Sequence, residues 1–137
     1  MIVRSFVDTN VFVYADDPRD PFKQARATEL VAGALQSRLG VVSTQVLQEY
    51  FSTATQKLRL DVSLARNKVE LMTALSVVQV DANLILAAID LHRMHRLSIW
   101  DALILQAAAA GGCRELLSED MQPGFRFGGV VVVNPFV

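Results

Sequence analysis

The sequence is poor in residues that bind soft metals. Its 137 residues include a single cysteine, Cys113, and two histidines. One cysteine cannot form an internal disulfide, and the chain has no set of thiols for zinc or an iron–sulfur cluster. His92 and His95 are three residues apart without further ligands nearby, so we interpret them as surface residues beside Arg93 and Arg96.

Long apolar runs are also lacking. The longest late run, residues 130–133, is far shorter than the roughly 20 residues of a membrane-spanning helix. The first 15 residues have neither a basic start nor a small-residue cleavage site, so we expect no signal peptide and a cytoplasmic protein. Hydrophobic residues make up 52% of the chain and charged residues 20%, which suits one folded domain over residues 1–137.

Strong net charge is absent as well. The 13 basic and 14 acidic residues give −1, which argues only weakly against a nucleic-acid partner, because local charge decides steering. Arginine outnumbers lysine ten to three, and its planar guanidinium suits phosphate. One basic stretch is open to two interpretations, a solvated helical face or a phosphate contact, and comprises Lys57, Arg59, Arg66 and Lys68.

The chain does contain an alternation of short β-prone runs and amphipathic stretches. We expect strands at residues 2–7, 41–43, 76–80, 115–118 and 130–133. Helical spacing predicts helices over residues 22–38, 44–58, 64–75, 82–96 and 99–110. Apolar strands separated by helices favour an α/β fold with a parallel sheet covered on both faces.

Two acidic residues directly follow expected strands. Asp8 comes after the first strand and Asp120 after the fourth. Taken alone, Asp8 could be a helix cap or turn residue, and Asp120 a solvated loop residue. Ligands in such folds bind beyond the carboxyl ends of strands, where the strand order reverses. If the first and fourth strands are neighbours, both carboxylates open into one crevice.

Two further acids lie near helix starts. Asp101 is three residues after Ser98, which is compatible with a capping box and equally with a functional role. Glu49 lies at the edge of the apolar stripe formed by Val46 and Tyr50 rather than opposite it. This position mildly favours a buried or cleft-lining glutamate.

Together the four acids suggest a metal site. Carboxylates crowded in a cleft repel one another unless a cation or proton offsets them. Oxygen ligands without cysteine or a histidine cluster select Mg²⁺ or Mn²⁺ rather than zinc. The remainder of the chain carries 13 basic and ten acidic residues. An acidic pit in a mildly basic body is typical of a metal-dependent phosphodiesterase.

These motifs resemble those of the PIN-domain ribonucleases, specifically the VapC-type toxins of bacterial type II toxin–antitoxin modules. The match covers nearly the whole chain in order: Asp8-Thr9-Asn10-Val11, Glu49, Trp100-Asp101-Ala102-Leu103 and Ser118-Glu119-Asp120-Met121. The resemblance implies a three-layer α/β/α sandwich around a five-stranded parallel sheet in the order 3-2-1-4-5. It also implies a Mg²⁺- or Mn²⁺-dependent endoribonuclease that cleaves RNA, usually a homodimer held in check by a cognate antitoxin.

The resemblance also assigns the site. The catalytic, metal-binding residues would be Asp8, Glu49, Asp101 and Asp120, with Asn10 and Ser118 in supporting positions. A housekeeping PIN nuclease would show the same four acids. Trp100, beside Asp101, could form a wall of the site, although a core aromatic is the simpler interpretation.

A third alternative is a metal-binding module without nuclease activity, such as a receiver domain. Asp81 ends the third expected strand, where a receiver has its phosphoacceptor. A receiver also has paired acids after its first strand and a lysine after its fifth, whereas Asp8 stands alone and no lysine follows Lys68. A phosphatase of the haloacid-dehalogenase type would need an aspartate at the position of Asn10.

Overall fold

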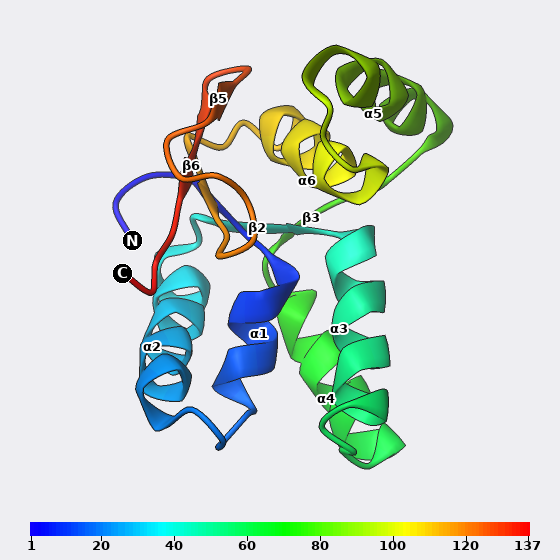
Figure 1. The fold of residues 1–137 in the computed structure, drawn as a ribbon. Helices are drawn as coiled ribbons and strands as arrows, with labels where there is room; N and C mark the ends of the chain where they lie inside the picture. Colours follow the sequence, from blue (N-terminus) through cyan, green and yellow to red (C-terminus); the bar gives the residue numbers. More distant parts are fainter.

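A six-stranded sheet runs through the middle of the molecule in the computed structural model, which describes residues 1–137 (Figure 1). The strand order is β3-β2-β1-β4-β6-β5. Every neighbouring pair is parallel except β5 and β6. The strands are β1 (Ser5–Val7), β2 (Gly40–Ser43), β3 (Ser76–Val78), β4 (Glu115–Leu117), β5 (Arg126–Phe127) and β6 (Val130–Val133).

The expected α/β class is confirmed, and so is the 3-2-1-4-5 order, with β6 as the fifth of the expected parallel strands. The expected count of five is one too low, because β5 adds a short antiparallel edge. β5 has only two residues, which are too few to give a periodic hydrophobic pattern in the sequence. Gly128 and Gly129 join β5 to β6, both with positive φ, as a two-residue hairpin turn with this twist requires.

Helices cover both faces of the sheet, which gives three layers (Figure 1). In Figure 1, α1 to α4 lie on one side of the sheet, and α5 and α6 on the other. Their bounds are α1 (Thr9–Ala15), α2 (Pro21–Ser37), α3 (Thr44–Gln56), α4 (Val62–Met72), α5 (Ala82–His95) and α6 (Ile99–Ala110). None of them combines the length and the hydropathy that crossing a membrane would require.

Helix α1 is the one helix that the sequence pattern did not predict. It has only seven residues, and its Val11, Phe12 and Val13 are weak helix formers. Packing compensates for this propensity, since Val11 and Phe12 are buried against the neighbouring helices. The N-cap Asp8 accepts a hydrogen bond from the backbone N–H of Thr9 and so starts the helix at the end of β1.

The core places the carboxyl ends of the two central strands side by side. All residues of β1 and β2 are buried, and α6 packs on β2, β4 and β6 with six of its residues buried. Val7 is paired with Leu117, so the residues that follow, Asp8 and Ser118, emerge together. From β1 the chain continues to β2 on one side while β4 lies on the other, which makes this edge a topological switch point.

Candidate functional site

Asp8 is the most buried of the four acids, with 7% of its surface exposed. Its backbone N–H donates to the carbonyl of Leu117 at 3.1 Å, which fixes it at the junction of β1 and β4. The carboxylate accepts the N–H of Thr9 and the hydroxyl of Ser118, each at 2.8 Å. Asp8 is therefore both the cap of α1 and a pocket residue, so the two interpretations of the sequence do not exclude each other.

Burial raises the pKa of Asp8 to about 6. The hydrogen bonds from Ser118 and Thr9 act in the opposite direction, and the charges of Glu49 and Asp120 raise the pKa further. At neutral pH this carboxylate is thus ionised at a cost to the free energy of folding. A cation in the pocket would offset that cost.

Glu49 of α3 accepts hydrogen bonds from Thr9 of α1 and from Gln45 of its own helix. The Thr9 hydroxyl donates to Oε1 at 2.8 Å, and the Gln45 amide donates to Oε2 at 3.4 Å. The same amide donates to the carbonyl of Trp100 at 3.3 Å. Two acceptors on one side fix the orientation of the Gln45 amide and leave its Oε1 buried without a donor. The side chain of Glu49 is consequently oriented rather than free.

Asp101 lies in the first turn of α6, where its N–H donates to the hydroxyl of Ser98 at 3.0 Å. The reciprocal bond of a capping box, from the backbone N–H of Ser98 to the Asp101 carboxylate, does not form. Burial raises the pKa of Asp101, as do the charges of Asp120 and Glu49, while Ser98 lowers it. Asp101 therefore takes part in capping α6 and also lines the acidic pocket.

Asp120 is the most exposed of the four and lies in the loop after β4. The amide of Asn10 donates to its Oδ2, and its own N–H donates to the hydroxyl of Ser118 at 3.3 Å. The structure thus places Asn10 against Asp120, and Ser118 between Asp120 and Asp8. The preceding residue, Glu119, instead forms an ion pair with Lys23 of α2 at 2.7 Å.

The four acids line a single pocket of about 280 Å³. No basic side chain is among its eleven lining residues, and none of the four acids forms an ion pair. Several carboxylates facing one space without a counter-charge form an electrostatically unfavourable arrangement. The residues lining the pocket are Asp8, Thr9, Asn10, Gln45, Glu49, Ser52, Thr53, Trp100, Asp101, Ile104 and Asp120.

The chemistry of these ligands fits a hard divalent cation. Carboxylate and amide oxygens are the ligands that Mg²⁺ and Mn²⁺ prefer, and Gln45 adds a buried oxygen without a donor. A coordination shell is not preformed, because no three acidic, histidine or cysteine side chains converge closely enough to hold a metal ion. The oxygen ligands that a cation would need lie in one pocket, but the carboxylates, which repel one another, are not drawn together into a coordination shell.

The sequence profile of the PIN domain matches residues 5–125, which include all four acids. The chain belongs to the PIN-domain family. No curated protein matches it. The family membership implied by the sequence motifs is thereby confirmed.

Solved structures share this fold at low sequence identity. VapC20 of Mycobacterium tuberculosis, described as a toxin that cleaves the sarcin–ricin loop, is 21% identical with a TM-score of 0.69, covering 85% of this chain and 91% of that one. A toxin–antitoxin complex from Klebsiella pneumoniae is 18% identical (TM-score 0.68; 96% and 97% covered). VapBC2 of Rickettsia felis, bound to a DNA fragment from its promoter, is 15% identical (0.68; 95% and 97%). At such identities these likenesses establish the fold.

Sequence reasoning missed several residues that line the pocket of this PIN domain. Thr9 and Gln45 orient Glu49, and Gln45 could have been found because residues four apart share a helix face. The core interpretation of Trp100 is wrong, since its side chain is 62% exposed and lines the pocket. Asp81 is not part of the site: it caps α5 through Leu84 N–H, next to the edge strand β3.

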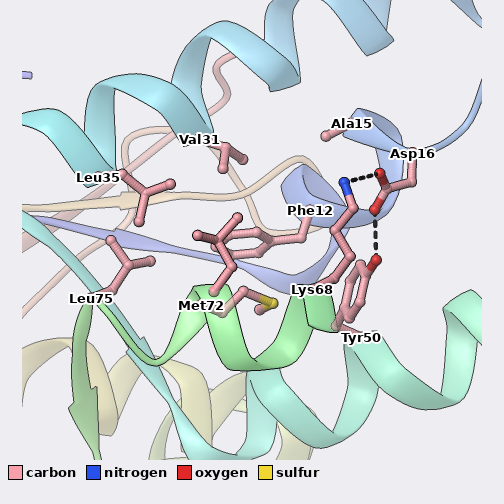
Figure 2. A pocket seen from close by; sticks show the side chains of 10 residues that line it. Phe12, Ala15, Asp16, Val31, Leu35, Tyr50, Lys68, Met72 and Leu75 are labelled. Atoms are coloured by element: carbon pink, nitrogen blue, oxygen red, sulfur yellow. Dashed lines mark hydrogen bonds and ion pairs between the residues drawn. The ribbon is translucent and has the colours of Figure 1, made fainter. Parts of the chain in front are cut away.

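A second pocket of the PIN domain, of about 50 Å³, is apolar (Figure 2). Eight of its ten lining residues are hydrophobic, and its charged residues pair with each other. Asp16 accepts the hydroxyl of Tyr50 at 2.6 Å and the ammonium of Lys68 at 2.9 Å. Lys68 thus has an ion-pair partner within the fold. Arg66 has one as well, since it pairs with Glu70 at 2.9 Å. Two members of the basic stretch are therefore engaged within the fold.

Proposed function

We propose that the chain is an endoribonuclease that uses Mg²⁺ or Mn²⁺ to hydrolyse RNA phosphodiester bonds, as the toxin of a toxin–antitoxin pair. The observation that carries the proposal is the pocket of four carboxylates without a basic counter-charge, located at the switch point of a PIN fold. Such a pocket attracts cations and repels a bare phosphate, so catalysis on phosphate there needs a bound cation.

The proposed ligands are Asp8, Glu49, Asp101 and Asp120. When bound, a divalent cation would activate water for attack and offset the negative charge on the phosphate. The chain's own contribution is orientation of these ligands through their hydrogen bonds. Ser118 and the N–H of Thr9 orient Asp8, the Thr9 hydroxyl and Gln45 orient Glu49, and Asn10 orients Asp120.

The toxin role rests on likeness to toxin structures over almost the full length of both chains. We infer a cognate antitoxin as a protein partner, RNA as the substrate and a homodimer as the assembly. A housekeeping PIN nuclease is the second candidate, since it would use the same pocket. Growth arrest on expression, relieved by coexpression of the antitoxin, supports the toxin role, and unimpaired growth of cells containing active nuclease contradicts it.

The nuclease activity is tested by incubating purified protein with total RNA in Mn²⁺, in Mg²⁺ and in chelator. We expect cleavage only with metal, and loss of cleavage to background in Asp8→Asn. Asp81→Asn is the matched control, because it changes an acid outside the pocket and asparagine can still cap α5. Cleavage in chelator, or undiminished cleavage by folded Asp8→Asn, would refute the proposal.

A further inference from the structure

Of the two apolar side chains that line the acidic pocket, only one is open to solvent. Trp100 is the chain's only tryptophan, and it is the only aromatic residue in the pocket lining. Its side chain is 62% exposed beside Asp101. A large indole left in water forgoes the stabilisation that burial would provide. Exposed apolar side chains are common on protein surfaces, and Trp100 differs from the other exposed ones in lining the acidic pocket.

The backbone that carries this indole is fixed relative to the acids. Trp100 lies in the first turn of α6. Ala102, two residues further along, is fully buried in the core. The Gln45 amide donates both to the carbonyl of Trp100 and to Glu49. A single buried side chain thus links the indole's backbone to a proposed metal ligand. The backbone position from which the indole projects is therefore fixed relative to the pocket.

Short polar side chains line the pocket together with the indole. Ser52 and Thr53 of α3 line the same pocket, and both are small, polar and at least partly exposed. Ile104, the other apolar residue of the lining, is buried beneath the surface. An exposed ring next to short hydroxyl side chains and carboxylates suits a ligand with an aromatic face and hydrogen-bonding edges. An unpaired nucleobase has both features.

We propose that Trp100 is a stacking platform for an unpaired base of the RNA substrate, next to the phosphate that is cleaved. The proposal rests on the proposed function for its choice of substrate. Proteins read single-stranded RNA by stacking splayed bases on aromatic side chains, and each stack contributes roughly a 10-fold to 100-fold gain in affinity. Trp100 thereby selects substrates in which the base beside the cleaved bond is unstacked.

Tryptophan fluorescence tests the contact directly, because all of the tryptophan emission comes from Trp100. Single-stranded RNA of about 10 nucleotides, a length typical of such sites, is titrated into Asp8→Asn protein with Mg²⁺. We expect saturable quenching of the emission. A series of the same RNA with one abasic position at a time should show one position whose loss weakens binding about 10-fold.

The Trp100→Ala variant and the abasic RNA together form a double-mutant cycle. In this variant the sensitive abasic position should have no further effect on RNA affinity, measured by anisotropy of labelled RNA. Trp100→Phe should restore most of the affinity. In the otherwise wild-type protein, Trp100→Ala should raise KM about 10-fold with kcat and Mn²⁺ affinity nearly unchanged. The matched control is Phe22→Ala, which removes another exposed aromatic, outside the pocket.

The outcomes separate this inference from the nuclease assignment. RNA that quenches the emission and has one sensitive abasic position, but is not cleaved in the presence of metal, supports the stacking platform and refutes the proposed nuclease activity. Metal-dependent cleavage in which Trp100→Ala keeps the wild-type KM and abasic pattern overturns the platform and keeps the activity. A third outcome is emission that is already blue-shifted without RNA, changes with protein concentration and does not respond to RNA. It would show that a second copy of the chain covers Trp100, and it also overturns the proposal.

Discussion

Two pockets of this PIN domain share helix α3 and differ in how they treat charge. The acidic pocket holds four carboxylates without a basic partner. In the apolar pocket, the single carboxylate, Asp16, is neutralised by Lys68 and accepts a hydrogen bond from Tyr50 (Figure 2). Glu49 and Tyr50 are successive residues, and each lines one of the two pockets, because adjacent positions of a helix point about 100° apart.

The difference separates stabilising from functional interactions. In the apolar pocket, buried hydrophobic surface and mutually paired charges lower the free energy of the folded chain. Burial and the neighbouring Asp16 raise the pKa of Tyr50, so its hydroxyl remains a neutral donor. In the acidic pocket, burial raises the pKa of Asp8, and mutual repulsion adds to it. We therefore expect substitutions in the apolar pocket to destabilise the fold and removal of an acid from the acidic pocket to stabilise it.

The largest expected effect on stability is from Phe12→Ala in the apolar pocket. Phe12 is buried, and truncating such a phenylalanine costs about 3–5 kcal/mol. Chemical denaturation should show this loss in chelator and in Mn²⁺ alike. The folded fraction should bind Mn²⁺ with the wild-type affinity in calorimetric titration. A loss below about 1 kcal/mol would mean that this pocket contributes little to the core.

A smaller effect of opposite sign is expected from Asp8→Asn in chelator. The pKa of Asp8 is raised from 3.8 to about 6, so the folded state favours the protonated carboxyl, and ionisation above pH 6 destabilises it. The variant should be more stable than wild type by about 3 kcal/mol at pH 8. The difference should shrink as the pH falls through 6 and nearly vanish below about pH 4.

Denaturation curves of wild type and Asp8→Asn at pH 8 and pH 4.5, both in chelator, measure this. Asp81→Asn serves as the control and should leave the free energy of unfolding unchanged at both pH values. Added Mn²⁺ should reverse the order at pH 8 by stabilising wild type more than the variant. An Asp8→Asn protein that is less stable than wild type at pH 8 in chelator would show that the hydrogen bonds from Ser118 and Thr9 outweigh the burial of charge.

The acidic pocket could in large part be predicted from the sequence, whereas the apolar pocket could not. The pattern places Asp8 and Asp120 after strands, and the strand order that the family resemblance implies makes those strands neighbours, so the two acids are expected to meet, as the pairing of β1 with β4 allows. The resemblance also implies supporting positions for Asn10 and Ser118, and in the structure Asn10 contacts Asp120 while Ser118 contacts both Asp8 and Asp120. These relations depend on topology, which a parallel α/β pattern constrains strongly.

The remaining features depend on three-dimensional packing that a linear pattern does not carry. Trp100 occupies an ordinary helical position in the first turn of α6, and the sequence pattern does not show that its side chain is exposed and lines the pocket. The two bonds of Gln45 depend on the rotamer of one side chain. The seven-residue α1 forms against its helix propensity because tertiary packing overrides it. The pairing of Lys68 with Asp16 joins residues that are 52 positions apart.

The smallest expected effect is from Tyr50→Phe, which sharpens the comparison at the boundary of the two pockets. The variant removes the hydroxyl that donates to Asp16 and leaves the ring in place, so it should cost about 1.5 kcal/mol in chemical denaturation. Lys68 continues to pair with Asp16, which keeps the loss moderate. Although Tyr50 adjoins Glu49, the bonds of Glu49 come from Thr9 and Gln45, so Mn²⁺ affinity should be unchanged. A several-fold fall in Mn²⁺ affinity would instead show that α3 transmits changes from the apolar pocket to the acidic one.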